Sequence, residues 1–266
     1  MAGKKINGGY QSRHVGLKPG DSYSADEGFI LLAKDQANDI FNQMGYTCAV
    51  FDYRYNGESE GLPRGLIDWH QQQEDWKSAI IYTRQLENVD PDQVGLFGTS
   101  FSGGHVIQLA ASDKRVKAVI IAAAPKLAAL GLLDTLFGLD KRPITVPLTG
   151  KPGEAALMND PDVLRTFPQL IPDGHLFQAN IPARLVLRLL FLKPGSYASG
   201  VKAPILFSIY GKDSVAPARP TVAYAKPATR GVIKWYNVGH FEIYYGEAFE
   251  RAMQDYKQFI QECLPV

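Results

Sequence analysis

The sequence predicts an α/β fold, in which a mostly parallel β-sheet carries helices on both faces. Three observations support this prediction. Short runs of β-branched and aromatic residues alternate with segments of helical periodicity. Most of these runs are apolar on both faces, as expected of strands that helices cover on both sides. A chain of 266 residues is also long enough for one sizeable α/β domain with an elaboration.

Individual elements follow from the same periodicity. The predicted strands are Thr47–Tyr53, Val94–Phe97, Val116–Ala122, Ile205–Tyr210 and Val232–Tyr236. The predicted helices, which have apolar residues at helical spacing, are Ala33–Met44, Trp76–Thr83 and Phe249–Cys263. Gly45 follows the first of these helices and is expected to end it.

One region breaks the alternation of strands and helices. From about Lys126 to Lys202 the chain is rich in proline and contains Leu-rich pieces, KLAALGLLDTLFGL and ARLVLRLLFL. We interpret residues 126–202 as a helical lid inserted into a core formed by residues 1–125 and 203–266. A lid would line an apolar pocket beside the catalytic end of the strands. The alternative is that this region supplies extra core helices.

Composition and charge exclude several classes of partner. A net charge of +1 and the lack of a dense Lys/Arg run argue against a nucleic-acid partner. The first residues have no apolar core of the kind a secretory signal needs, and no stretch is apolar enough to span a membrane. The two cysteines, Cys48 and Cys263, do not require an oxidising compartment, although they could pair. We therefore expect a cytoplasmic protein.

The segment VGLFGTSFSGGHVIQLAA indicates a nucleophilic serine. It has the pattern of a strand, a tight Gly-rich turn and a helix, with Ser100 between Gly98 and Ser102. A nucleophile on so sharp a turn needs small residues two positions away on each side, where larger side chains would collide. The turn would also direct the N–H of Phe101 toward a developing oxyanion.

This Gly-rich turn differs from two other Gly-rich motifs that join a strand to a helix. A phosphate-binding P-loop needs Lys and Ser or Thr after its last glycine, whereas His105 and Val106 follow Gly104. The segment does not spell the dinucleotide-binding pattern G-x-G-x-x-G either. The remaining alternative is that Ser100 is only a helix cap.

Two residues downstream have the types and positions that a serine nucleophile requires. Asp213 follows the strand ILFSIY, and His240 follows the strand VIKWY. In such α/β enzymes the chain order is serine, then acid, then histidine, each on a loop after a strand. His240 would take the proton of Ser100, and Asp213 would hold the imidazole tautomer.

Other acids and histidines fit this pattern less well. Asp52 is the best rival to Asp213, but it precedes the serine in the chain. His105 lies on the helix after Ser100 and is expected to pack or cap there, and the remaining histidines lack the required placement. No cluster of His, Cys and carboxylates has metal-ligand spacing, so we expect neither a metal nor a cofactor.

Several longer segments resemble one subgroup of α/β hydrolases. They are DYRYNGESEGLPRGLIDWHQQQEDWKSAI, FGTSFSGGHV, VPLTGKPGEAALMNDPD, YGKDSVAPAR and VGHFEIYYGEAFERA. They are similar to dienelactone-hydrolase-related enzymes, which include fungal polyketide transferases and trans-acting hydrolases of natural-product clusters. The resemblance covers roughly Gly28 to Ile260. It implies a Ser100–His240–Asp213 triad acting on esters or thioesters with an apolar acyl chain.

The N-terminus departs from this family pattern. Members usually have an antiparallel hairpin and then a strand ending in His-Gly-Phe, whose loop supplies the second oxyanion N–H. Here the first 26 residues show no clear strand, so the N-terminal strands are expected to be reduced or divergent. The pair Gly28-Phe29 is the part that can be aligned, which makes the N–H of Phe29 the candidate second donor.

Three hypotheses of function follow. The first is a serine hydrolase that releases a carboxylic acid from an ester or thioester. In the second, an alcohol or amine intercepts the same acyl-enzyme, which makes the protein an acyltransferase, or the same triad performs a related carbonyl reaction. The third is a non-catalytic ligand-binding protein with an incomplete oxyanion hole. The expected partner is a small-molecule or carrier-bound acyl group, and the resemblance adds a polyketide synthase. The sequence leaves the oligomeric state open.

Overall fold

The computed structural model describes residues 31–57, 59–87, 89–122, 143–170, 179–185 and 192–266. The chain divides into two compact units, which are described separately. Unit 1 comprises residues 1–88 and 127–192, and unit 2 comprises residues 89–126 and 193–266. The predicted division into a core and a lid over residues 126–202 stays a prediction.

Unit 2 contains a four-stranded sheet in the order β1-β2-β5-β6. Its strands are β1 (Val94–Thr99), β2 (Val116–Ala122), β5 (Ile205–Tyr210) and β6 (Gly231–Tyr236). Every neighbouring pair is parallel, and β5 is buried along its whole length. These findings confirm four of the predicted strands and the parallel sheet. In the described part of the chain β6 is an edge strand, and it exposes Trp235.

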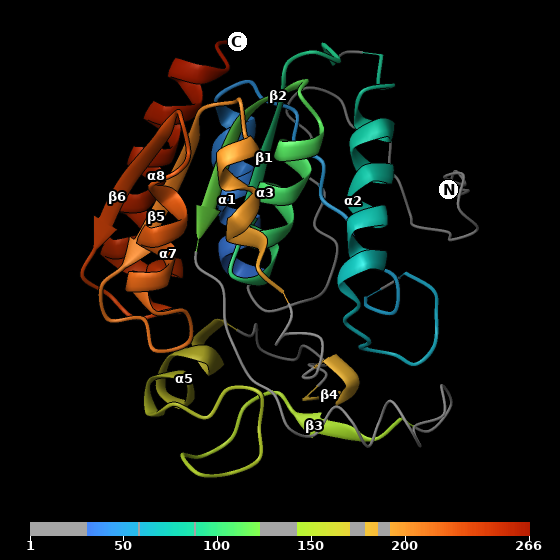
Figure 1. Ribbon diagram of the computed structural model, residues 1–266, viewed down its shortest axis with the longest axis vertical. Coiled ribbons are helices and arrows are strands. Elements are labelled where there is room, and N and C mark those ends of the chain that lie inside the picture. Colours follow the sequence, from blue (N-terminus) through green and yellow to red (C-terminus); the bar gives the residue numbers. More distant parts are fainter. Residues whose placement is uncertain (1–30, 58, 88, 123–142, 171–178, 186–191) are drawn as a thin grey trace. The chain divides into compact units, whose positions relative to one another are not determined.

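Helices cover both faces of this sheet. The helix α3 (Phe101–Ser112) and the helix α7 (Ala218–Ala225) lie on one face, and α8 (Gly246–Cys263) lies on the other (Figure 1). Successive residues of β1 show this alternation. The ring of Phe97 contacts Tyr256 of α8, with centroids 5.8 Å apart. A Cβ placed on Gly98 would instead meet Val106 of α3. Because the pleat alternates side chains between faces, one strand packs against both helix layers.

The described residues of unit 2 also form two short 3-10 helices. The helix η2 (Pro194–Gly200) packs against α3 and α7, where the backbone of Gly195 lies against the ring of Tyr224. A Cβ at Gly195 would come within 2.0 Å of that ring, so the close approach requires glycine. The second, η3 (Glu242–Tyr244), follows the loop after β6 and precedes α8.

Unit 1 is built from shorter pieces. The helices in its described residues are α1 (Leu31–Gln43), α2 (Trp69–Thr83), α5 (Pro161–Thr166) and the 3-10 helix η1 (Phe167–Leu170). The helix α1 ends as predicted, because Gly45 takes a φ of 93°, a conformation that glycine adopts readily. Asp68 caps α2, because its carboxylate accepts hydrogen bonds from the N–H groups of His70 and Gln71.

The prediction of a strand over Thr47–Tyr53 is wrong for the described part of the chain. None of these residues is assigned to a sheet there, although the run has the composition of a strand. A strand needs a ladder partner as well as suitable side chains, and composition does not reveal the partner. Instead, the ring of Phe51 packs edge-on against those of Tyr53 and Trp76. The indole N–H of Trp76 donates to the hydroxyl of Tyr53 at 2.7 Å.

The described part of residues 126–202 contains an element that the sequence did not predict. The strands β3 (Thr145–Pro147) and β4 (Asn180–Pro182) form a two-stranded antiparallel sheet. Each strand has three residues, too few for an alternating hydrophobic pattern to be recognised. The Leu-rich pieces named above lie largely outside the described residues, as does the N-terminal region with the candidate Phe29.

Both cysteines are free thiols, Cys48 in unit 1 and Cys263 in unit 2. Burial raises the pKa of the Cys48 thiol to about 12, which keeps it protonated and unreactive at neutral pH. Within the described residues, no helix has the length and apolar character required to cross a membrane.

Candidate active site

Ser100 lies on the turn between β1 and α3, in a backbone conformation that is unusual for a residue with a side chain. Its φ is 50° and its ψ is −121°. Non-glycine residues with positive φ are uncommon and cluster at functional sites, where the surrounding structure holds the strain. The strand ends at Thr99 and the helix begins at Phe101, so Ser100 occupies the whole change of direction.

The small residues that flank Ser100 have a direct steric cause. A Cβ on Gly98 would lie 2.5 Å from the carbonyl oxygen of Ser102 and 2.8 Å from a methyl carbon of Val106. Only glycine therefore fits at position 98, where the strand leads into the turn. This is the collision that the sequence pattern predicts between the two flanking positions.

Ser102 occupies a position where the common motif has glycine, and its hydroxyl group stabilises the turn. It donates a hydrogen bond to the carbonyl oxygen of Thr99 at 2.8 Å and accepts one from the N–H of Thr99 at 3.2 Å. Both bonds are local to the turn. The departure from the common motif thus adds hydrogen bonds to the turn.

The side chain of Ser100 is directed toward a histidine. The hydroxyl oxygen of Ser100 lies 2.9 Å from Nε2 of His240, and this side chain makes no capping hydrogen bond with α3. The alternative in which Ser100 serves as a helix cap therefore has no support in the geometry. Phe101, the proposed first oxyanion donor, is the first residue of α3.

His240 and Asp213 meet because β5 and β6 are parallel neighbours. Tyr210 and Tyr236 are paired in the register at the ends of these strands. Beyond them the loops remain hydrogen-bonded, since Gly211 N donates to Tyr236 O at 2.8 Å and Lys212 N to Val238 O at 3.0 Å. The loop that carries Asp213 is thereby held against the loop that carries His240.

A short hydrogen bond joins the two side chains. Nδ1 of His240 lies 2.7 Å from Oδ2 of Asp213, and both side chains are buried, with 1% and 0% of their surface exposed. The other carboxylate oxygen of Asp213 accepts a bond from the N–H of Ala216 at 2.6 Å. A carboxylate only accepts hydrogen bonds, so this geometry assigns the hydrogen of His240 to Nδ1. Nε2 then accepts from the hydroxyl of Ser100.

The other candidates lie elsewhere. Asp52, the rival acid, belongs to unit 1, where its carbonyl oxygen accepts a bond from the hydroxyl of Ser59. His70 lies at the start of α2, also in unit 1. His105 is fully buried beside the ring of Phe101, and burial lowers its pKa to about 3. It therefore stays neutral at physiological pH, as a packing residue would.

Sequence reasoning missed a second connection at this site. The hydroxyl of Tyr244, on η3, is hydrogen-bonded to the hydroxyl of Thr99, the residue before Ser100. Burial raises the pKa of Tyr244 well above its ordinary value, so the phenol stays protonated at neutral pH. The tyrosine belongs to the segment HFEIYY, which carries no motif that would have indicated this bond.

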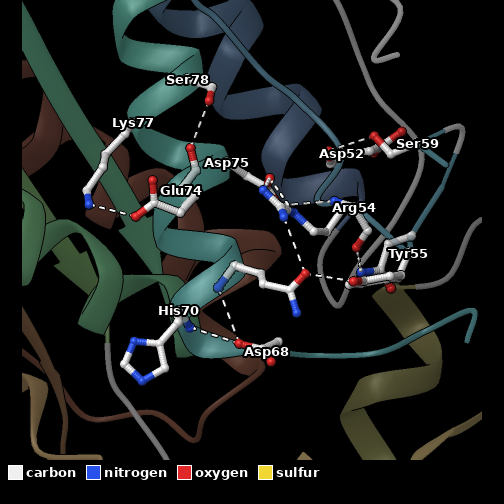
Figure 2. A network of polar contacts seen from close by, with 12 residues as sticks. Asp52, Arg54, Tyr55, Ser59, Asp68, His70, Glu74, Asp75, Lys77 and Ser78 are labelled. Carbon is white, nitrogen blue, oxygen red and sulfur yellow. Dashed lines mark hydrogen bonds and ion pairs between the residues drawn. The ribbon is translucent and has the colours of Figure 1, made fainter. Parts of the chain in front are cut away.

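Unit 1 has its own polar network, which the sequence did not indicate either. Figure 2 shows the guanidinium of Arg54 against the carboxylate of Asp75. The contacts with this carboxylate are 2.7 Å from Nε and 2.6 Å from Nη2. The backbone N–H of Arg54 donates to the same carboxylate at 3.1 Å. Gln71 then accepts from Arg54 at 3.3 Å and from the hydroxyl of Tyr55 at 2.6 Å. This network ties the segment after Tyr53 to α2.

A parallel sheet with a serine on a strand-to-helix turn, followed along the chain by an aspartate and a histidine on later loops, is the arrangement of α/β-hydrolase enzymes. Comparisons with known proteins agree. The family described as "X-Pro dipeptidyl-peptidase (S15 family)" matches residues 10–129. The "Quorum-quenching protein AidA" of Acinetobacter baumannii is 44% identical over 239 residues, which cover 84% of this chain and 79% of that protein.

A further relative and a similar solved structure come from fungi. The "Thiohydrolase aneE" of Aspergillus aculeatus is 27% identical over 255 residues, covering 86% of this chain and 80% of that protein. The crystal structure of the α/β hydrolase GrgF from Penicillium has a TM-score of 0.75 at 21% identity, covering 87% of this chain and 84% of that one. The chain belongs to the α/β-hydrolase family, and it is an enzyme. The fold and the family that the sequence motifs implied are thereby confirmed.

Proposed function

We propose that this enzyme is a serine hydrolase that cleaves an ester or thioester with an apolar acyl group through an acyl-enzyme on Ser100. The observation that carries the proposal is the continuous chain of hydrogen bonds from Ser100 through His240 to Asp213, with distances of 2.9 and 2.7 Å. The three residues lie on loops that follow strands, and they occur along the chain in the order serine, aspartate, histidine that this chemistry uses.

The first half-reaction forms the acyl-enzyme. The hydroxyl oxygen of Ser100 attacks the carbonyl carbon while Nε2 of His240 takes its proton. Asp213 keeps the hydrogen on Nδ1 and stabilises the imidazolium. The N–H of Phe101 stabilises the oxyanion, together with a second donor for which Phe29 is the candidate. The bond to the leaving alcohol or thiol then breaks, and the leaving group receives the proton from His240.

The second half-reaction releases the acid. Nε2 of His240 takes a proton from water, the hydroxide attacks the acyl carbon, and the bond to Ser100 breaks. Ser100 regains its proton from His240. An acyltransferase differs only at this step, because an alcohol or amine replaces the water.

The relatives support two classes of acyl substrate. One is named a thiohydrolase, which supports a thioester with a small-molecule or carrier-bound acyl chain. A polyketide synthase as the donor of that chain is the finer form of this proposal. The relative named a quorum-quenching protein supports a second substrate class, the signal molecules of quorum sensing. The proposed chemistry would act on those signal molecules that carry an ester or a lactone. Both classes require the same acyl-enzyme.

The decisive experiment is labelling by a fluorophosphonate, read as intact mass. We expect one adduct on the wild type and none on Ser100→Ala. Ser102→Ala is the matched control, since Ser102 lies on the same turn but its hydroxyl is bonded to Thr99. This variant should keep the adduct. Folded wild-type protein without an adduct, or with an adduct that persists in Ser100→Ala, would contradict the proposed nucleophile.

A substrate panel then separates the alternatives. Release of acid from a p-nitrophenyl ester, an acyl thioester and an N-acyl homoserine lactone would be compared by kcat/KM, each with and without added alcohols or amines. Hydrolysis that acceptors leave unchanged supports the hydrolase. Acyl transfer that exceeds hydrolysis in the presence of an acceptor would favour the acyltransferase.

A further inference from the structure

Two neighbouring hydrogen bonds join two segments of unit 2. We call residues 99–102 the nucleophile turn and residues 240–244 the histidine loop. One bond connects Ser100 with His240, and the other connects Thr99 with Tyr244. Thr99 directly precedes Ser100, and Tyr244 follows His240 by four residues. The same two segments of unit 2 are therefore joined once through the reacting groups and once through groups that do not react.

Tyr244 is held close to His240, and Thr99 is held close to Ser100, by contacts within each segment. On the histidine side, the ring of Phe241 packs edge-on against that of His240, with centroids 4.7 Å apart, and the N–H of Tyr244 donates to the carbonyl of Phe241. On the serine side, Ser102 bonds both backbone groups of Thr99. A displacement of Tyr244 relative to Thr99 would therefore displace His240 relative to Ser100.

The two bonds differ in what happens to them during the proposed reaction. When Ser100 is acylated, its oxygen no longer carries a hydrogen, so it cannot donate to Nε2 of His240. The bond between Thr99 and Tyr244 involves no reacting atom and persists. His240 must nevertheless remain at the turn, because it has to take a proton from the incoming water.

We propose that Tyr244 and Thr99 are positioning residues that hold His240 at the nucleophile turn while Ser100 carries the acyl group. This inference rests on the proposed function and adds a specific expectation to it. Loss of the bond between Tyr244 and Thr99 slows deacylation more than acylation, because the bond between Ser100 and His240 aligns the histidine only before acylation.

The experiment measures both half-reactions with p-nitrophenyl acetate. Stopped-flow absorbance gives the acylation burst, and intact mass follows the decay of the acetyl-enzyme. In Tyr244→Phe, deacylation should fall about tenfold, the effect of losing one neutral hydrogen bond in the transition state. Acylation should change by less than about twofold, since the bond between Ser100 and His240 remains.

Substitutions at the other end of the bond test whether this bond is the cause. Thr99→Val keeps the shape of the side chain and should slow deacylation as Tyr244→Phe does. The double variant should be no slower than either single variant, because all three lack the same bond. Thr99→Ser retains a hydroxyl group and should deacylate at about the wild-type rate. The comparison of Thr99→Val with Thr99→Ser also tests the inference if Tyr244→Phe fails to fold.

Tyr256→Phe is the matched control. Tyr256 is another buried tyrosine of unit 2, and its hydroxyl bonds to that of Ser208 at 2.7 Å, between α8 and β5. Its loss should lower the thermal stability and leave the ratio of the two rate constants unchanged. Equal slowing of both half-reactions in Tyr244→Phe, or the same change of ratio in Tyr256→Phe, would overturn the inference. A wild type with neither burst nor fluorophosphonate adduct would instead contradict the proposed function.

Discussion

The two polar networks of this enzyme are built in opposite ways. In unit 2, Ser100 and His240 are 140 residues apart in the chain, and the histidine and aspartate side chains are almost fully buried. In unit 1, Arg54 and Asp75 are only 21 residues apart, and their side chains are 15% and 13% exposed (Figure 2). The first network joins three separate loops, whereas the second fastens one segment to the next helix.

This difference teaches what each network can do. The carboxylate of Asp75 receives the backbone N–H, Nε and Nη2 of Arg54, so the pair closes a local loop with several bonds at once. The serine–histidine–aspartate network has one bond at each step and includes a residue with strained φ and ψ. Redundant local bonds favour stability, while single bonds between titratable groups allow a proton to move. Substitutions in the two networks should therefore separate activity from stability.

The largest effect is expected at Asp213. In Asp213→Asn the amide can donate to Nδ1 of His240, which places the imidazole hydrogen on Nε2, where it can no longer accept the proton of Ser100. The kcat/KM for an ester substrate should fall about a thousandfold or more. The free energy of unfolding, measured in urea, should change much less. A variant with near wild-type turnover would contradict the assigned tautomer.

The opposite result is expected in unit 1. Asp75→Ala leaves the guanidinium of Arg54 partly buried without its carboxylate, and should lower the free energy of unfolding by about 3 kcal/mol. The rate of fluorophosphonate labelling per folded molecule should stay unchanged. The control is Lys77→Ala, because the pair Glu74–Lys77 has side chains that are 60% and 51% exposed. Its loss should cost less than about 0.5 kcal/mol. Equal losses in the free energy of unfolding for Asp75→Ala and Lys77→Ala would contradict the larger role assigned to the ion pair of Arg54 and Asp75.

A smaller effect is expected from His105, which lies on α3 near the nucleophile turn but has a structural role. Its folded pKa is about 3, whereas an unfolded histidine binds a proton near pH 6.5. Between pH 3 and pH 6.5 the unfolded state binds more protons than the folded state. The contribution of neutral His105 to the free energy of unfolding is therefore fully present above pH 6.5 and is lost as the pH falls toward 3. The expected slope is about 1.4 kcal/mol per pH unit.

His105→Gln tests this pH dependence, because glutamine is neutral and of similar size. The free energy of unfolding in urea would be measured for both proteins at pH 7.5 and pH 5. The wild type should lose about 2 kcal/mol more than the variant over this interval. Parallel losses in the two proteins would mean that His105 is not buried as a neutral group.

Much of the fold could be predicted because its elements are long and periodic. The parallel strands β1, β2, β5 and β6 and the helices α1, α2 and α8 all follow from hydrophobic spacing. The failure at Thr47–Tyr53 has a different cause, since a ladder partner is a property of the whole fold. The three-residue strands β3 and β4 are shorter than any period that could reveal them.

The candidate site shows the same limit at the level of side chains. Ser100, Asp213 and His240 could be named because each follows a predicted strand in the order that α/β hydrolases use. The bond between Thr99 and Tyr244 could not, because it connects two common hydroxyl residues 145 positions apart. Nor could the pairing of Arg54 with Asp75, since charged residues of both signs are frequent in the surrounding segment.

The placement of the three tryptophans gives each unit a different optical signature. Trp69 and Trp76 belong to unit 1, where Trp69 is 5% exposed, whereas Trp235 lies on β6 of unit 2 and is 55% exposed. Indole emission shifts to longer wavelength in contact with water, so the native spectrum of Trp235 should already resemble that of an unfolded chain. The change of fluorescence on unfolding therefore reports mainly on unit 1. Far-UV ellipticity, to which the helices of both units contribute, would follow the unfolding of both units in the same sample.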